Sequence, residues 1–272
     1  MKISVIVPTY KPQAYLWECL DSIAAQTFPK EDFEVLLVLN GCCEPYNGQI
    51  KAWLSKHYDL QVRYIQTDVP GVSNARNIAL DMASGEYVTF IDDDDYVSSD
   101  FLSELYRNAS PNTISVCYPY AFNDEKPKHQ IYYGLTEVYD YCVKNGCNTI
   151  ISKARKFFSG PCMKLISMSF IQGRRFDVRF KNGEDSLFMF LISDKFKKIS
   201  FASKGAVYYR RFRVNSAVTV HRGTQERVLN NLRSIREYVR MYMRGGYNTF
   251  FFLTRILAET RGILLAPINS RK

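Results

Sequence analysis

The sequence has no apolar run of the roughly 20 residues that a helix needs to cross a bilayer. The longest candidate, residues 250–266, is interrupted by Arg255, Glu259 and Arg261. The first residues also contain no apolar stretch of signal-peptide length and no small-residue cleavage site. These absences argue against a secreted or membrane-spanning chain. We therefore expect a cytoplasmic protein, and peripheral contact with the inner face of the cytoplasmic membrane remains an open alternative.

The cysteines also lack the spacing that is typical of metal sites and disulfide frameworks. The seven cysteines are odd in number, none is arranged as C-x-x-C, and Cys42 and Cys43 are adjacent. This arrangement disfavours a zinc site or a disulfide framework and is typical of a reducing compartment. With 272 residues, 46% of them hydrophobic, the chain is long enough to bury a full-sized core without such links.

Strand-like and helix-like segments alternate along the N-terminal part of the chain. The apolar runs that predict strands are 3–7, 34–39, 62–66, 87–91 and 115–120. Apolar residues at helical spacing predict helices at 16–24, 73–82, 99–108 and 136–145. The alternation is typical of an α/β domain in which helices flank a mostly parallel sheet.

A run of four aspartates, Asp92 to Asp95, directly follows the strand predicted at 87–91. Like charges this close together repel each other unless a cation neutralises them. Their oxygen atoms favour Mg²⁺ or Mn²⁺ over zinc. Because ligands of open α/β sheets bind beyond the carboxyl ends of the strands, we expect Pro8–Tyr10, Asn40–Gly41 and the aspartates to share one crevice. The alternative is a solvated acidic turn that caps the following helix.

The net charge of +9 is concentrated at the C-terminal end of the chain. Residues 204–272 hold 14 Lys and Arg against 3 Asp and Glu, whereas the residues before them hold 22 against 24. Helical spacing of apolar residues on both sides of Gly245-Gly246 predicts two amphipathic, arginine-flanked helices within a C-terminal extension, residues 221–272. Such helices suit the surface of an anionic bilayer. Alternatively, they pack on the rest of the chain with a solvated basic face.

Several ordered motifs resemble family 2 of the glycosyltransferases, an inverting group with the GT-A (Rossmann-like) fold. The motifs are Val5–Tyr10, Gly71–Asn77, Phe90–Asp95 and Asn182–Phe188. The resemblance implies a GT-A domain at 1–220, in which residues 1–110 bind the nucleotide sugar and residues 111–220 form the acceptor and catalytic half. It implies metal-dependent transfer from a nucleotide-diphosphate sugar, such as a UDP-sugar, to a glycan or lipid-linked acceptor in bacterial surface polysaccharide or capsule synthesis.

The resemblance also implies unequal roles for the four aspartates. The family's D-x-D-D pattern maps onto Asp92, Asp94 and Asp95, and Asp93 stands at its variable position. Asp94 is the expected ligand of Mn²⁺ or Mg²⁺, while Asp92 is expected to contact the nucleotide ribose or the metal. Asp93 is expected to be one of the residues that bind the donor. His221 follows at a distance where relatives can place a further metal ligand, although a lone histidine in a basic segment can be incidental.

The catalytic base implied by the resemblance is Asp185, which follows Glu184. An inverting transfer is a single displacement at the anomeric carbon, in which a carboxylate takes the proton of the acceptor hydroxyl. A metal ion stabilises the departing diphosphate in such a reaction. Without the resemblance, an acidic pair at the start of a helix would only complement the helix dipole.

The nucleotide base is expected beside the loop after the first strand, along Pro8, Thr9 and Tyr10. This loop combines a stiff proline, a hydroxyl group and an aromatic face that can stack on a ring. Asn40 stands where the family usually has an acidic residue. Its amide group can still pair with a base edge, but the missing carboxylate leaves the choice of uridine over another nucleotide open.

Two arginines are expected at the diphosphate. Arg76 lies early in the helix at 73–82, where its guanidinium and the helix N-terminus both favour an anion. Its alternative is a surface arginine paired with Asp81 or Glu86. Arg213 ends a segment that resembles one that closes over the diphosphate in some family members, where an arginine would neutralise charge on the leaving group.

Two other classes of protein remain as alternatives at this point. A sugar-phosphate nucleotidyltransferase also uses aspartates and a metal on an α/β sheet, but the glycine-rich phosphate loop typical near its N-terminus is missing here. A nucleic-acid-binding protein would agree with the sequence pI of about 9.1. However, the positive charge is confined to the C-terminal segment, and the predicted crevice is acidic. We therefore expect no nucleic-acid partner.

Overall fold

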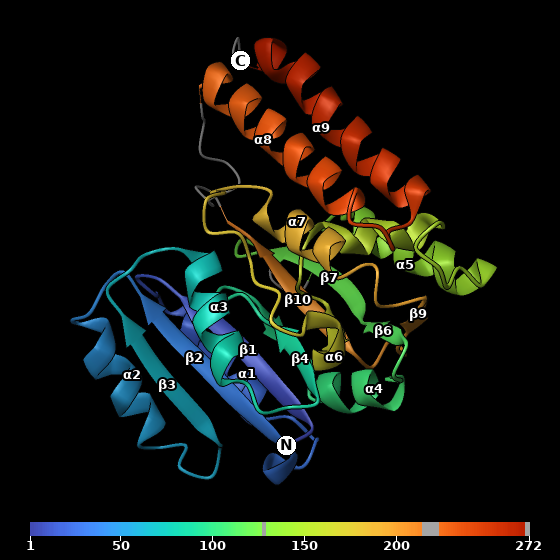
Figure 1. Cartoon of the computed structure of the whole chain (residues 1–272). Helices are drawn as coiled ribbons and strands as arrows, with labels where there is room; N and C mark the ends of the chain where they lie inside the picture. The colour runs from blue at the N-terminus through green and yellow to red at the C-terminus, as the bar shows by residue number, and fades with distance from the viewer. Residues whose placement is uncertain (127–128, 214–222, 270–272) are drawn as a thin grey trace.

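The computed structural model describes residues 1–126, 129–213 and 223–269 (Figure 1). The strands are β1 (Ile3–Thr9), β2 (Phe33–Asn40), β3 (Val62–Thr67), β4 (Tyr87–Phe90), β5 (Tyr96–Val97), β6 (Thr113–Val116), β7 (Tyr118–Asn123), β8 (Lys164–Ser167), β9 (Lys198–Phe201) and β10 (Val207–Phe212). The helices are α1 (Tyr15–Ala24), α2 (Tyr46–Leu54), α3 (Val72–Met82), α4 (Phe101–Arg107), α5 (Gly134–Asn145), α6 (Met168–Ile171), α7 (Glu184–Leu191), α8 (Thr224–Tyr242) and α9 (Thr249–Asn269). Short 3₁₀ segments lie at Lys30–Asp32 and Lys153–Ser159.

A large sheet has the strand order β3-β2-β1-β4-β8-β6-β9, and a smaller sheet has the order β5-β10-β7. In the large sheet, β1 pairs in parallel with β2 and β4, and β2 pairs in parallel with β3. The strand β8 runs antiparallel to both of its neighbours, β4 and β6. All residues of β1 and β2 are buried, which explains their continuous apolar sequences. The α/β class with a mostly parallel sheet is thus confirmed.

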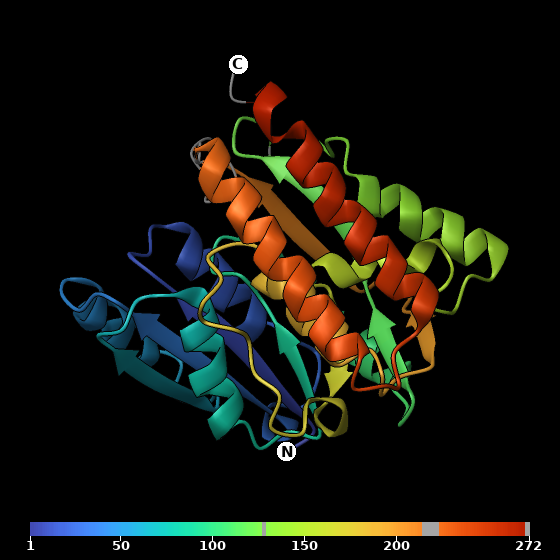
Figure 2. The same ribbon diagram turned by 45° about the horizontal axis from the view of Figure 1, so that its top comes forward.

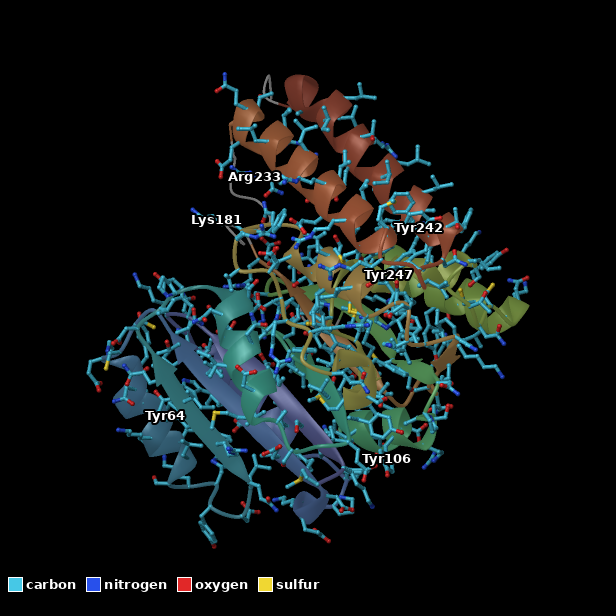
Figure 3. The ribbon with its side chains drawn as sticks, in the orientation of Figure 1. Tyr64, Tyr106, Lys181, Arg233, Tyr242 and Tyr247 are labelled. Carbon is cyan, nitrogen blue, oxygen red and sulfur yellow. The ribbon has the colours of Figure 1, made fainter. Side chains whose placement is uncertain are left out.

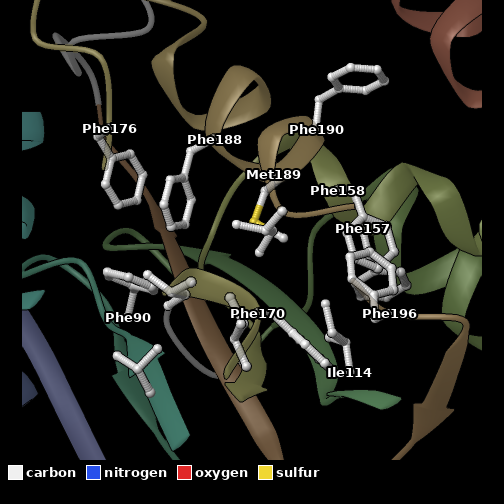
Figure 4. Packing of buried hydrophobic residues seen from close by; sticks show 14 of the residues in the cluster. Phe90, Ile114, Phe157, Phe158, Phe170, Phe176, Phe188, Met189, Phe190 and Phe196 are labelled. Carbon is white, nitrogen blue, oxygen red and sulfur yellow. The ribbon is translucent and has the colours of Figure 1, made fainter. Parts of the chain in front are cut away.

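Successive residues of the central strands enter cores on opposite faces of the large sheet. Ile6 of β1 lies in the core that contains residues of α3 and α7, whereas its neighbour Val5 lies in the core with α1. Phe90, at the end of β4, packs edge-on against Phe176 and Phe188, which stack on each other at 3.8 Å between ring centroids (Figure 4). This aromatic packing holds α7 over the end of β4.

One expectation about local structure was wrong, one helix was confirmed with a shorter span, and one helix was missed. The strand expected at 115–120 is two strands, because the chain passes at Cys117 from β6 in the large sheet to β7 in the small one. The helix expected at 99–108 is α4 and begins only at Phe101. The sequence pattern also missed α2, which buries only Ile50 and Trp53 and therefore has little apolar stripe to recognise.

The expected C-terminal helices form a hairpin, and α8 and α9 lie side by side in both views (Figures 1 and 2). Gly245 and Gly246 separate them, with φ values of 81° and 87° that favour glycine. Buried Phe251 of α9 contacts Phe158 and Phe190, so the hairpin packs against α7 and the segment before β8. Among the helices in the described ranges, none is long and apolar enough to cross a membrane.

Candidate active site

The carboxyl ends of β1, β2 and β4 open into a cleft of about 960 Å³, a volume suited to a ligand of drug size or larger. The residues of the cleft that the sequence had singled out are Pro8, Thr9, Tyr10, Asn40, Arg76, Asp92, Asp93, Asp94, Asp95, Asp185 and Arg213. Segments from across the chain therefore converge on one place. His221 lies outside the described residues.

The four aspartates form a turn directly after β4, in which the backbone N–H of Asp95 donates to the carbonyl of Asp92. Their carboxylates have different partners. Asp95 is buried and accepts a hydrogen bond from the backbone N–H of Arg211 at 2.8 Å. The Thr9 hydroxyl donates to Asp93 at 2.5 Å. Asp94 forms an ion pair with Arg213, at 2.5 Å between Nη2 and Oδ2, so the turn presents its charges to several elements rather than to solvent alone.

Burial and mutual repulsion disfavour the charged forms of Asp93, Asp94 and Asp95, although Arg213 pairs with Asp94. Burial raises the pKa of Asp93 to about 7, against the opposing effect of the Thr9 hydrogen bond. Burial also raises the pKa of Asp94 and of Asp95, and the neighbouring carboxylates raise them further. A divalent cation would relieve this repulsion.

The residues of the turn fit a magnesium-type cation better than zinc, because only oxygen ligands are offered. In the described part of the chain, no three His, Cys, Asp or Glu side chains converge as a complete metal site. Mg²⁺ is commonly held by one or two carboxylates and completed by substrate phosphates and water. Asp94 and Asp92 fit that arrangement.

Arg76 connects the aspartate turn to α7. Its side chain is 3% exposed, Nη1 donates to Asp185 Oδ1 at 2.6 Å, and Nη2 donates to Asp92 Oδ1 at 2.9 Å. Burial raises the pKa of Asp185, and the charge of Arg76 opposes that rise. The alternative of a surface arginine paired with Asp81 or Glu86 is wrong, because Arg76 is buried and Asp81 pairs with Arg175 instead. Arg76 thus aligns two carboxylates from distant elements, and its contact with a diphosphate stays a prediction.

The loop after β1 is tied to the rest of the cleft by Asn40. Its amide Nδ2 donates to the carbonyl of Thr9 at 2.7 Å, and its Oδ1 accepts from the backbone N–H of Gly71 at 2.9 Å. Both ends of the amide are therefore used by the protein, and pairing with a base edge stays a prediction. Tyr10 is 49% exposed at the mouth of the cleft, where its ring is accessible for stacking.

The strand β10 brings arginines to the cleft beside the aspartates. Arg210 Nη1 donates to the Tyr133 hydroxyl at 3.0 Å, and Arg213 stacks over the ring of Tyr15 at 4.6 Å. Arg210 and Arg213 both line the cleft. Sequence reasoning missed Tyr15, which begins α1 and carries no motif around it, and Lys181, which lines the cleft from the segment before α7.

An acidic turn at the end of a parallel strand, bridged by an arginine to a carboxylate on a helix within one arginine-lined cleft, is the arrangement of a GT-A glycosyltransferase. The chain belongs to Glycosyl transferase family 2, whose family model matches residues 4–174. The resemblance recognised in the sequence is therefore confirmed.

Two curated relatives illustrate the match. The poly(ribitol-phosphate) beta-N-acetylglucosaminyltransferase TarS of Staphylococcus aureus (strain Mu50) is 41% identical over 104 residues, which are 38% of this chain and 18% of TarS. Glycosyltransferase GlyA of Streptococcus pneumoniae serotype 4 is 31% identical over 219 residues, which are 77% of this chain and 30% of GlyA. The chain thus spans less than a third of the length of these two relatives.

Solved structures share the fold. The crystal structure of S. aureus TarS in complex with UDP-GlcNAc superposes with a TM-score of 0.67 and 23% identity, covering 88% of this chain and 67% of that one. The mannosyltransferase PcManGT from Pyrobaculum calidifontis, in complex with GDP-Man and Mn²⁺, superposes with a TM-score of 0.65 and 19% identity, covering 98% and 73% of the two chains. At these identities the likeness concerns the fold alone.

Proposed function

We propose that the chain catalyses metal-dependent, inverting transfer of a sugar from a UDP-sugar to a glycan or lipid-linked acceptor in bacterial surface polysaccharide synthesis. The observation that supports this best is the arrangement of Asp185, Arg76 and Asp92. The guanidinium of buried Arg76 pairs with this carboxylate of α7 and with Asp92 of the acidic turn, and all three residues line the cleft. UDP is favoured as the nucleotide because TarS, which is 41% identical to this chain over 104 residues, was crystallised in complex with UDP-GlcNAc.

Each side chain of the cleft has a role in this proposal. Asp185 accepts the proton of the acceptor hydroxyl as that oxygen attacks the anomeric carbon, and one displacement inverts the configuration. Asp94 and Asp92 would hold Mn²⁺ or Mg²⁺, which when bound would stabilise negative charge on the leaving diphosphate. Arg213 and Arg76 add positive charge at the same end of the cleft.

The remaining assignments concern the donor and the division of the chain. Pro8, Thr9, Tyr10 and Asn40 bind the nucleoside, together with Asp93. We further propose that residues 1–110 form the nucleotide-sugar half, 111–220 the acceptor and catalytic half, and 221–272 a basic extension. The Arg76–Asp185 hydrogen bond joins the first part to the second, and the hydrogen bond from Asn230 to Asn182 joins the third part to the second.

Donor turnover tests this function directly. Incubation of the protein with Mn²⁺ and a panel of UDP-, GDP- and other nucleotide sugars is expected to release a free nucleoside diphosphate by slow hydrolysis, measured by chromatography. EDTA should stop the release, and added Mn²⁺ or Mg²⁺ should restore it, because the acidic turn needs a cation to bind the diphosphate. Release that is equally fast in EDTA would contradict metal dependence, and no turnover of any donor, with or without saccharide acceptors, would contradict the enzyme activity.

We also propose that the hairpin contacts an anionic bilayer through one face, which we call the outer face. To this face we assign six large apolar side chains of the hairpin that are between 42% and 79% exposed: Leu232, Val239, Met243, Leu253, Leu257 and Leu264. They recur at helical spacing on both helices and, on α8, adjoin the arginines of the same helix. Exposed apolar surface beside cationic side chains is the combination that binds anionic lipid surfaces.

Vesicle flotation tests the outer face. The double variant Leu253→Glu/Leu257→Glu is expected to bind vesicles of phosphatidylglycerol and phosphatidylcholine more than about tenfold more weakly than the native chain, because each buried leucine contributes roughly 1.5–3 kcal/mol. A matched control is Tyr58→Glu/Tyr132→Glu, which adds the same charge at two exposed aromatic positions outside the hairpin. Equal flotation of the native chain and the leucine variant would exclude this face as the membrane contact.

A further inference from the structure

A second concave surface lies outside the catalytic cleft, between α8 and the segment that precedes α7. It consists of two adjoining cavities of about 250 and 380 Å³ that share Arg179, Glu237 and Arg240. We call the combined surface the arginine groove. Its arginines are Arg175, Arg179, Arg233, Arg236, Arg240 and Arg244. Only two carboxylates, Asp177 and Glu237, line the same surface, so six positive charges face two negative ones.

The two carboxylates of the groove are already paired. Arg179 pairs with Asp177 at 2.5 Å and with Glu237 at 2.9 Å, and Arg240 lies 3.7 Å from Glu237. The uncompensated charge therefore belongs to other members of the groove.

That uncompensated charge comes from Arg233 and Arg236 of α8 and from Arg244, just after the helix. Within the described residues, Arg233, Arg236 and Arg244 have no ion-pair partner, and all three are exposed. A guanidinium presents several N–H donors in a fixed fork that matches the oxygens of a phosphate group. The groove therefore offers a binding surface for phosphates rather than a set of satisfied surface ion pairs.

The groove is continuous with the catalytic cleft along the chain. Phe180 lines the groove, while Lys181 and Asn182, the next two residues, line the cleft. The Asn230 side chain of α8 donates to the carbonyl of Asn182 at 3.1 Å and holds the helix against this segment. Figure 3 shows Arg233 on α8 and Lys181 on the segment at the same edge of the molecule. The groove and the cleft therefore adjoin at residues 180–182, and α8 is held against the segment that links them.

We infer that the arginine groove binds phosphate groups of the acceptor, so that the natural acceptor is a phosphate-bearing glycan or glycolipid rather than a neutral saccharide. This inference rests on the proposed glycosyl transfer, because it assumes that the groove is occupied by the acceptor of that reaction. The groove lies outside the donor site, since none of the six arginines lines the donor cleft. The positive charge of the groove therefore complements phosphate groups of the acceptor and not the diphosphate of the donor.

The test compares acceptors with and without phosphate. A panel of monosaccharides is prepared as short-chain alkyl diphosphates and as the matching alkyl glycosides, and KM and kcat are measured for each. The variant Arg233→Gln/Arg236→Gln/Arg244→Gln is expected to raise KM for the phosphate-bearing acceptor at least about tenfold, because a hydrogen bond to a charged group is worth more than a neutral one. KM for the neutral glycoside and the rate of donor hydrolysis should change little.

Controls separate this inference from the proposed function. The variant Lys51→Gln/Lys56→Gln/Lys198→Gln removes the same number of charges from exposed positions outside the groove, and it should behave as the native chain. Absence of donor turnover in the native chain would contradict the glycosyltransferase proposal. Normal donor turnover with an unchanged KM in the arginine variant would instead overturn the groove as an acceptor site.

Vesicles distinguish the two sources of phosphate. In one outcome, the arginine variant loses flotation on phosphatidylglycerol vesicles yet keeps its KM for the soluble diphosphate acceptor. That result would assign the groove to lipid headgroups and overturn the inference. Loss of affinity for the soluble acceptor in the absence of any vesicle would support it.

Discussion

Replacement of Asp185 by asparagine is expected to lower the rate of transfer by about 10²–10⁴-fold, the usual contribution of a general base. Asparagine has nearly the same shape as aspartate but cannot take a proton from the acceptor hydroxyl. Donor binding should persist, because Asp185 lies on α7, and Arg76 still donates to Asp92 of the acidic turn. Steady-state transfer and calorimetric titration of the donor measure the two effects separately.

Two comparisons make the Asp185→Asn result specific. Asp140→Asn removes an exposed carboxylate that pairs with Lys204, and it should leave both transfer and donor affinity unchanged. Thermal unfolding reports whether loss of the Arg76 ion pair has destabilised the fold. A variant Asp185→Asn that transfers sugar at more than a tenth of the native rate would place the base elsewhere.

Replacement of Asp94 by asparagine is expected to remove most of the dependence of donor binding on the cation. The neutral amide no longer offers an anionic oxygen to the metal. The affinity of the protein for Mn²⁺ in the presence of donor should therefore fall more than about 100-fold. This loss is larger than the usual effect of removing a residue that only supports a metal ligand. Titration of the nucleotide sugar with and without Mn²⁺ measures this loss.

Neighbouring variants show whether the effect of Asp94→Asn arises from the metal. Asp93→Asn, at the variable position of the acidic run, should keep the Mn²⁺ dependence. Arg213→Gln removes the ion-pair partner of Asp94 without removing its carboxylate. If Arg213→Gln alone abolished the Mn²⁺ dependence as fully as Asp94→Asn, the carboxylate would act through the arginine and not as a ligand.

The parallel half of the sheet could be predicted because its signals are local. β1 and β2 are buried along their whole length, so each is a mostly apolar run that is visible without any knowledge of its neighbours. The position of the acidic turn follows from the same rule, because a polar run directly after such a strand lies at the ligand-binding edge of the sheet. The helical spacing of the C-terminal segment likewise indicated α8 and α9 correctly.

In other elements the local signal did not specify which sheet the strand joins. β10 pairs with β7 in parallel and with β5 in antiparallel orientation, and its partners precede it by many residues. The strand expected at 115–120 is interrupted at Cys117 because β6, before it, belongs to the large sheet and β7, after it, belongs to the small one. A propensity for strand is present in such segments, but the choice of sheet depends on packing that sequence periodicity does not contain.

The sequence by itself determined the family, the α/β class and the set of polar residues that gather at one edge of the sheet. Each of these follows from motifs and from the period of apolar residues. Only the tertiary structure decided which charges meet. Arg76 and Asp185 are 109 residues apart in the chain, yet the guanidinium bridges that carboxylate and Asp92. The arginine groove depends in the same way on α8 lying against the segment before α7. Ion pairing requires contact within a few ångströms, and no pattern of neighbouring residues specifies a contact between distant ones.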